Sequence, residues 1–191
     1  MMNLPLRSGA RILSLMTLPS VLTALGLFFC SPDLRAETEL IPNDKFADDG
    51  ASWTLSLAKE VAARMSVEKA DNEPALCIDV EGSGEGSEAS PDNIVNARVH
   101  RLFGEISAGT QYRISFKAKA EKDISIVSFV SPQKDGARVL WRMDVKLDPE
   151  WKEFAYNFTA RDTANDCVFG FSRLGNIANK YWFKDVVLTA D

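Results

Sequence analysis

The sequence predicts an all-β protein, a β-sandwich of two sheets that follows an N-terminal targeting segment. Three observations lead to this prediction. Residues 111–119 (QYRISFKAK) alternate apolar and polar side chains with period two, which is typical of a strand with one buried face. Residues 124–130 (ISIVSFV) are apolar in both phases, as in a strand covered on both sides. About eight such segments follow one another, with turns every ten to fifteen residues.

Residues 1–36 have the order of a secretory signal peptide. Two arginines precede an apolar stretch at 12–30, and a polar stretch then ends at Ala36, where we expect cleavage. A membrane anchor is the alternative, because the apolar stretch approaches the ~18 residues that a spanning helix needs. Lipidation at Cys30 is disfavoured by the bulky residues before it. The prediction is an exported chain, secreted or periplasmic, with no membrane span after signal removal.

Residues 37–191 then form a single domain with room for a core. Removing the leader takes away three arginines and one aspartate, so the net charge moves from −5 to −7. This acidic balance argues against a nucleic-acid partner, which would need a basic face. It also provides no basic patch for an anionic membrane.

Two cysteines remain in this domain, Cys77 and Cys167. In an oxidising compartment they favour one disulfide, although Cys77 is out of phase with Leu76 and Ile78 and should face away from the core. A metal site is disfavoured, because the sequence has a single histidine and no close cysteine pair.

The first half of the domain is expected to begin with a strand or arm at 43–46 and a turn at 49–50, with Trp53 packed beneath it. By composition residues 55–65 fit a short helix, but in an all-β fold they are instead two strands split near 59–60. A strand at 75–80 precedes an acidic, glycine-rich loop at 81–93, which lacks the spacing of a calcium loop. The expected strand at 94–103 places Asn96, Arg98 and His100 in its polar phase.

Beyond the two central segments, a turn is expected at 131–136. Four further strands are expected, at 138–147, 151–160, 167–171 and 181–188.

Four stretches together resemble one family. They are Asn43, Phe46, Gly50 and Trp53; residues 108–119; residues 145–159; and residues 182–188. In this order they resemble the CenC-like carbohydrate-binding modules of family 4/9 over nearly all of residues 37–191. The resemblance implies a galactose-binding-like β-jelly-roll whose concave sheet can cradle a glycan chain.

Two positions depart from the family pattern. Ala47 stands where an acid usually follows the opening Phe, and Lys184 replaces the first of two acidic or amide residues in the closing strand, leaving Asp185. In the family this region can contribute to a structural calcium site. An ammonium group there opposes a cation, so we expect no cofactor and regard structural calcium as doubtful.

Glycan binding uses aromatic faces that stack on sugars and planar polar groups that bind hydroxyls. The polar phases supply basic and amide groups, which would form a partly basic groove if they share one sheet; alternatively, they are ordinary solvated residues. Trp141 is in the apolar phase and is a ligand contact only if a bulge re-aims it. Either Tyr181 or Trp182 should face outward, near the turn residue Gln133. The candidate ligand-binding residues are Asn96, Arg98, His100, Arg113, Gln133, Arg138, Trp141, Arg142, Tyr181 and Trp182.

Catalysis has little support. His100 has no serine elbow or cysteine partner in its context, and the acids gather in loops. Two carboxylates brought together by the fold would be the one route to glycoside hydrolysis that the sequence leaves open. We therefore expect no catalytic residues and no enzyme activity.

The predicted function is that of an exported, non-catalytic carbohydrate-binding protein that recognises a polysaccharide or oligosaccharide in a shallow cleft on one sheet. The alternative is a structural or protein–protein interaction module of the cell surface. A sugar site should show an accessible aromatic residue, whereas a protein contact should show a wide apolar patch.

Overall fold

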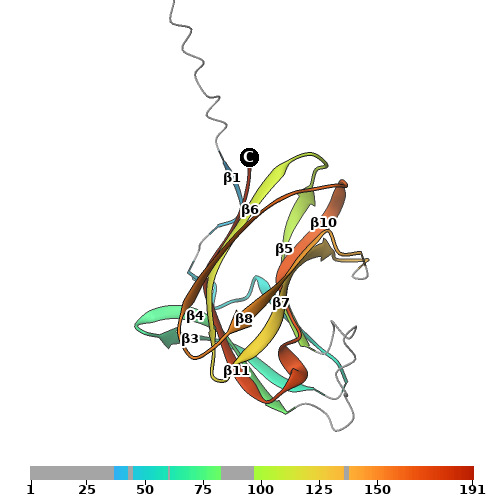
Figure 1. The fold of residues 1–191 in the computed structure, drawn as a ribbon. Helices are drawn as coiled ribbons and strands as arrows, with labels where there is room; N and C mark the ends of the chain where they lie inside the picture. Colours follow the sequence, from blue (N-terminus) through green and yellow to red (C-terminus); the bar gives the residue numbers. More distant parts are fainter. Residues whose placement is uncertain (1–36, 43–44, 60, 83–96, 136–137) are drawn as a thin grey trace, which may run out of the picture. The chain divides into compact units, whose positions relative to one another are not determined.

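The computed structural model describes residues 37–42, 45–59, 61–82, 97–135 and 138–191, and it confirms the all-β prediction (Figure 1). Within these ranges the chain forms eleven strands and one 3-10 turn, Leu174–Asn176. None of the described segments is a helix of the length and apolarity needed to cross a membrane.

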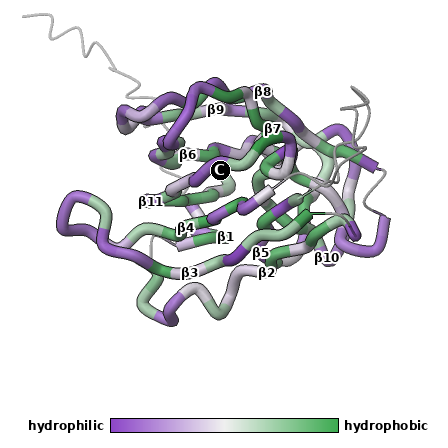
Figure 2. Tube along the Cα trace, turned by 90° about the horizontal axis from the view of Figure 1, so that it is seen from below, coloured by the Kyte–Doolittle hydropathy of each residue, from purple (hydrophilic) through white to green (hydrophobic). Residues whose placement is uncertain are grey.

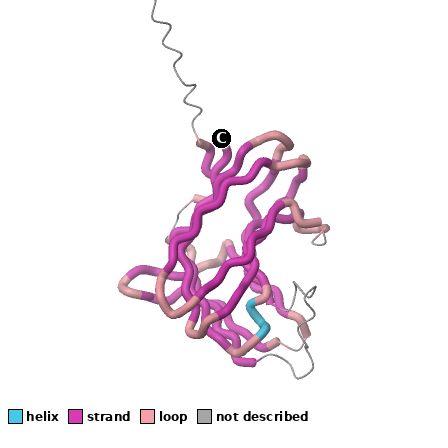
Figure 3. The backbone as a smooth tube through the Cα atoms, viewed as in Figure 1, coloured by secondary structure: helices cyan, strands magenta, loops and turns pink. Residues whose placement is uncertain are grey.

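The strands form two antiparallel sheets, drawn in magenta in Figure 3. One sheet has the order β3-β4-β11-β6-β9, with β1 paired to β11. Its strands are β1 (Thr38–Ile41), β3 (Ala62–Ala70), β4 (Glu73–Gly82), β6 (Gln111–Ala120), β9 (Lys152–Thr159) and β11 (Asn179–Ala190). The other sheet has the order β2-β5-β10-β7-β8. Its strands are β2 (Trp53–Leu57), β5 (Ala97–Ile106), β7 (Ile124–Pro132), β8 (Trp141–Leu147) and β10 (Ala164–Ser172).

Aromatic rings from both sheets form the centre of the core. Phe171 of β10 stacks on Phe183 of β11 with ring centroids 4.0 Å apart. Phe116 of β6 meets Phe171 edge to face at 4.9 Å. Trp53 is 3% exposed and packs on the same rings, which confirms its expected role in the core. Hydrophobic and hydrophilic residues alternate along many strands in Figure 2, so each sheet has one face on this core and one outer face.

The strand periodicities hold, and the alternative left open at residues 55–65 is decided in favour of two strands. These residues are not helical: they contain the end of β2 and the start of β3, which are separated near residues 59–60 as expected for an all-β fold and lie in different sheets. The two central segments follow one another in the chain but do not pair, since β6 belongs to the six-stranded sheet and β7 to the five-stranded one. The chain therefore crosses between sheets at the polar connection 121–123 instead of turning back on itself.

The favoured disulfide is also wrong. Cys77 and Cys167 are both free and fully buried. Cys77 pairs with Trp182 and Ser66 across the six-stranded sheet and faces away from the core, as its phase predicted. Cys167 belongs to the core cluster and lies on β10 of the other sheet. The two thiols are therefore on opposite sides of the six-stranded sheet.

Candidate functional site

The outer face of the five-stranded sheet is organised as two rows of side chains that run across all five strands. Residues that pair across antiparallel strands place their side chains on the same face. One row is Thr54, His100, Gly170, Phe129 and Arg142. The next row is Ser56, Arg98, Ser172, Val127 and Asp144.

Several polar atoms on this face are buried without a hydrogen-bond partner among the residues that the structure describes. They are Arg98 Nε, His100 Nδ1, Ser172 Oγ and, on the neighbouring end of β7, Ser131 Oγ. Buried polar groups in native proteins nearly always have a partner, so a cluster of unsatisfied ones marks a place where a ligand or water completes the set. Hydroxyl, imidazole and guanidinium groups together match the hydroxyls and carboxylates of a polar ligand.

Burial and charge both act on the histidine in this cluster. Burial lowers the pKa of His100, and the nearby Arg98 guanidinium lowers it further. The imidazole is consequently neutral at neutral pH, with one nitrogen able to donate and the other able to accept a hydrogen bond.

Gly170 occupies the middle of the first row, where the backbone of β5 comes very close. A Cβ at this position would lie 2.2 Å from the carbonyl oxygen of Val99 and 2.8 Å from the Cβ of His100, closer than real Cβ contacts. Gly170 stands between His100 and Phe129 in the row because the neighbouring strand leaves no room for a side chain there. Phe129 is only 5% exposed and packs with Val127 and Val168.

The face is predominantly basic. Arg142 is exposed and makes no hydrogen bond or ion pair with the parts of the chain that the structure describes. Asp144 is the one carboxylate in the two rows, and it pairs with Arg173 at 3.4 Å. A glycoside hydrolase needs two carboxylates that flank the scissile bond, and these rows offer no such pair. The arrangement can bind a polar ligand, but it lacks the groups for hydrolysis by that route.

The structure brings only some of the predicted ligand residues together. Arg98, His100 and Arg142 share the outer face of the five-stranded sheet, as the hypothesis required. Asn96 lies outside the described residues. Arg113 does not join them, because β6 places it on the outer face of the other sheet, paired with Asn157 and Thr189.

The remaining candidates have different surroundings. Arg138 forms an ion pair with Asp162 at 3.1 Å and lines, with Trp141, a hollow of about 410 Å³ beside β9. Trp141 also stacks on Phe158 at 5.5 Å, so it packs on the core as its phase indicated. Gln133 is exposed in the turn after β7, where its backbone N–H donates to the carbonyl oxygen of Asp166.

The aromatic pair divides as expected. Tyr181 is fully buried, and its hydroxyl donates to the carbonyl oxygen of Leu174 at 2.7 Å, so it is not a ligand contact. Trp182 faces outward on the six-stranded sheet, with the ammonium groups of Lys119 and Lys180 5.4 and 5.5 Å from its ring centroid. It therefore lies on the opposite layer from the arginine rows.

The sequence interpretation missed the small residues of the rows. Gly170 and Ser172 come from β10, where Phe169 and Phe171 fill the core phase. The alternation of large aromatic and small residues in FGFS was the available signal, because it marks a strand whose outer phase is kept clear. Within the described residues no group of three or more His, Cys, Asp or Glu side chains is placed to hold a metal ion.

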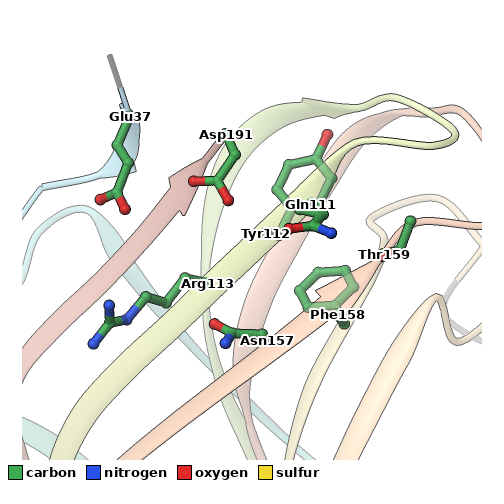
Figure 4. Close-up of a pocket in the computed structure, with 8 residues that line it drawn as sticks. All are labelled: Glu37, Gln111, Tyr112, Arg113, Asn157, Phe158, Thr159 and Asp191. Atoms are coloured by element: carbon green, nitrogen blue, oxygen red, sulfur yellow. The ribbon is translucent and has the colours of Figure 1, made fainter. Parts of the chain in front are cut away.

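The outer face of the six-stranded sheet carries a second feature, shown in Figure 4. A hollow of about 470 Å³ lies where β1, β6, β9 and the end of β11 meet. Its polar lining consists of Glu37, Gln111, Arg113, Asn157, Thr159 and Asp191.

Comparison with known proteins gives a consistent result. The carbohydrate binding domain family that combines types 4 and 9 matches residues 38–173. A solved CBM4 structure is 23% identical, with a TM-score of 0.59, and the match covers 81% of this chain and 95% of that one. The N-terminal cellulose-binding domain of β-1,4-glucanase C from Cellulomonas fimi is 21% identical, with a TM-score of 0.53, covering 78% and 95%.

A third similar structure contains a catalytic module as well. It is the CBM22-1–GH10 portion of xylanase 10B from Clostridium thermocellum, complexed with xylohexaose, at 16% identity and a TM-score of 0.54. The match covers 81% of this chain but 29% of that one. At these identities the structures show a shared fold. The search of curated proteins gave no match.

Proposed function

The chain belongs to the carbohydrate binding domain family 4/9, and from this premise we propose that it is an exported, non-catalytic protein that binds a polysaccharide along the outer face of its five-stranded sheet. The observation that carries the proposal is the cluster of unpartnered, buried polar atoms of Arg98, His100 and Ser172 in two adjoining rows. A glycan hydroxyl or carboxylate laid across the rows would meet the exposed Arg142 and the accessible part of Arg98 directly.

The charge of the face favours an acidic or heavily hydroxylated polysaccharide. Arg98 and Arg142 give this face a positive charge that favours anionic ligands, although the full sequence carries a net charge of −5. Guanidinium groups bind carboxylates with two parallel hydrogen bonds, which gives both affinity and orientation. Binding to such a face should weaken as the salt concentration rises.

The accessible aromatic ring expected of a sugar site is not found among the described residues of this face, so hydrogen bonds and charge would have the main role in binding there. Phe129 is the one aromatic residue in the two rows, and it is buried. The alternative function, a protein contact, would need a wide apolar patch. In the described part of this face Leu102 is the large apolar side chain that is exposed, so such a patch is not formed there.

Affinity electrophoresis on a polysaccharide panel tests the proposal. The panel contains polygalacturonate and alginate as acidic glycans and xylan, mannan and mixed-linkage glucan as neutral ones. We expect retardation by an acidic glycan, unchanged by a calcium chelator, and weakened about tenfold or more by Arg98→Ala and by Arg142→Ala, since hydrogen bonds to charged groups are worth about 1.5–3 kcal/mol.

A matched control is Arg64→Ala. Arg64 lies on β3 of the six-stranded sheet, away from the proposed binding face. Its side chain is 72% exposed and pairs with Asp79 and Glu81 of the same sheet. This variant should bind like the wild type. The variants Arg98→Ala, Arg142→Ala and Arg64→Ala should all melt at nearly the same temperature. Unchanged affinity in both Arg98→Ala and Arg142→Ala would remove this face from the site. No retardation by any glycan would favour the protein-contact function instead.

Export rests on the leader sequence and has its own test. N-terminal sequencing of the protein recovered outside the cytoplasm should begin at Glu37. A chain that retains residues 1–36 and stays with the membrane fraction would instead support the anchor interpretation.

A further inference from the structure

The hollow on the outer face of the six-stranded sheet is also built by paired rows. Arg113 pairs with Asn157 of β9 on one side and with Thr189 of β11 on the other, and Glu39 of β1 pairs with Thr189 in turn. The next row contains Gln111 and its partner Thr159. Asp191 reaches the same row, because its backbone N–H donates to the carbonyl oxygen of Gln111 at 3.0 Å. Figure 4 shows Gln111, Arg113, Asn157, Thr159 and Asp191 around one hollow, together with Glu37.

The polar side-chain groups that line this hollow do not bind one another. The lining side chains of Glu37, Gln111, Arg113, Asn157, Thr159 and Asp191 make no hydrogen bond or ion pair with any residue of the described ranges. Arg113 is positively charged and Glu37 and Asp191 are negatively charged, yet neither carboxylate lies within ion-pair distance of the Arg113 guanidinium. A ligand with several hydroxyl groups could bridge them, because such a ligand both donates and accepts hydrogen bonds.

The other half of the same face behaves differently. Lys180 pairs with Glu68 at 3.1 Å, and Lys184 pairs with Glu73 at 2.6 Å. Lys117 and Lys119 also have carboxylate partners, Asp185 and Asp71. The charged groups near Trp151 and Trp182 thus satisfy one another, whereas those of the hollow are left available.

A buried hydroxyl beside the hollow supports the same conclusion. Thr189 is 6% exposed, and its Oγ1 has no hydrogen-bond partner within the described structure. It lies between Glu39 and Arg113 in the cross-strand row. An unsatisfied buried hydroxyl next to a set of unengaged polar groups indicates a site that a ligand or water completes.

We propose that this hollow is a second saccharide-binding site, which takes a neutral, hydroxyl-rich sugar unit. Carboxylates, amides and a guanidinium group are planar polar groups that bind sugar hydroxyls in pairs. The carboxylates of Glu37 and Asp191 would repel an acidic sugar, so the two outer faces of the sandwich differ in the charge of the ligand they accept. Phe158 and Tyr112 also line the hollow, and their rings stack with centroids 5.3 Å apart.

Amide-resolved NMR titration locates such a site directly. The probes are cellohexaose, xylohexaose and mannohexaose, each at about 10 mM, a concentration that mostly fills a site with a Kd of about 1 mM. We expect one of them to shift the amides of residues 111–113, 157–159 and 189–191. Arg113→Ala and Asn157→Ala should each weaken this binding about 3- to 10-fold, the range of a lost hydrogen bond.

Two controls separate this site from the first. Arg64→Ala removes another arginine from the outer face of the same sheet and should leave the titration unchanged. Arg142→Ala should also leave it unchanged, because Arg142 belongs to the five-stranded sheet. No shift with any of the three probes, or shifts confined to β5, β8 and β10, would overturn the second site. An acidic oligogalacturonate titrated separately reports on the first face alone, so either site can fail independently.

Discussion

Gly170 lies directly opposite His100 in the five-stranded sheet, and the backbone of β5 passes so close that no larger residue fits there. A Cβ added to Gly170 would lie 2.2 Å from the carbonyl oxygen of Val99 and 2.9 Å from the Cα of His100. This contact sets the spacing of β5 and β10 at the centre of the proposed binding face.

Gly170→Ala should therefore destabilise the protein and damage the binding face. The clash is with backbone atoms, which cannot move without separating two central strands, so we expect a loss of about 3 kcal/mol or more in the free energy of unfolding. Urea denaturation measures this loss. Gly82→Ala in β4 is the control, because a Cβ there has no atom within 4 Å, and its stability should be close to that of the wild type. Equal midpoints for the two variants would contradict the close approach.

His100 should make the stability depend on pH between about 5 and 7. Its pKa is lowered in the folded protein by burial and by Arg98, whereas in the unfolded chain it should titrate near 6.5. The unfolded state then binds the proton first, so stability falls as the pH drops below about 6.5 and levels off once the pH is below the folded pKa. His100 is the only histidine in the sequence, so His100→Gln should flatten this slope.

Melting temperatures at pH 7.5, 6.5 and 5.5 provide the measurement. The carboxylates with shifted pKa values, such as Glu68 and Asp48, have them lowered from 4.5 and 3.8, so they titrate below this window. The same slope in His100→Gln as in the wild type would show that the histidine titrates normally in the folded state.

Local patterns in the sequence were sufficient to predict the faces of the strands but not the sheet to which each strand belongs. The phase of β5 correctly placed Arg98 and His100 outward, and that of β8 did the same for Arg142. Arg113 follows the same rule in β6, yet it lies on the other sheet. Period-two alternation reports burial on one side of a strand, and pairing depends on contacts between residues far apart in the chain.

The small residues of the site were harder to predict for a related reason. Gly170 and Ser172 matter because they carry no large side chain. Hydrophobic patterning detects only the large residues beside them. Composition alone left residues 55–65 open between a helix and two strands. The pairing of β2 with β5 and of β3 with β4 decides for the two strands that an all-β fold requires.

The two thiols of residues 37–191 should be free and unreactive in the native protein. Cys77 and Cys167 are fully buried on different sides of the six-stranded sheet, and burial raises the pKa of Cys77 to about 12. The reactive thiolate is therefore scarce at neutral pH. In the chain cleaved after Ala36, Ellman's reagent should detect no thiol before unfolding and two after it.

An introduced cysteine provides the positive control. Ala155→Cys puts a thiol on an exposed position of β9, and it should react at once. A reducing agent should leave the melting temperature unchanged. A mass two units lower than expected for the free thiols, together with a lower melting temperature under reduction, would restore the disulfide that the sequence favoured.

The carboxylate of Asp71, in the turn of the β3–β4 hairpin, holds this turn against the outer face of the same sheet. Asp71 and Asn72 form the turn with φ angles of 54° and 68°, the left-handed values of a tight hairpin. The Asp71 carboxylate accepts a hydrogen bond from the indole Nε1 of Trp151 and pairs with Lys119 at 3.3 Å. These contacts hold the pKa of Asp71 below its ordinary value of 3.8, with the Trp151 hydrogen bond as the largest cause.

Trp151→Phe should consequently raise the pKa of Asp71 toward its ordinary value, because the ring remains but the donor is lost. A folded-state pKa that is lowered contributes stability above the unfolded pKa, and this contribution disappears as the pH falls through the folded value. NMR titration of the Asp71 carboxyl carbon measures the shift directly. Trp182→Phe is the control, since its ring lies on the same face without a bond to Asp71. If Trp151→Phe leaves the titration unchanged, the nearby lysines, Lys119 first among them, lower the pKa, and the hairpin tip is held by an exposed ion pair of little strength.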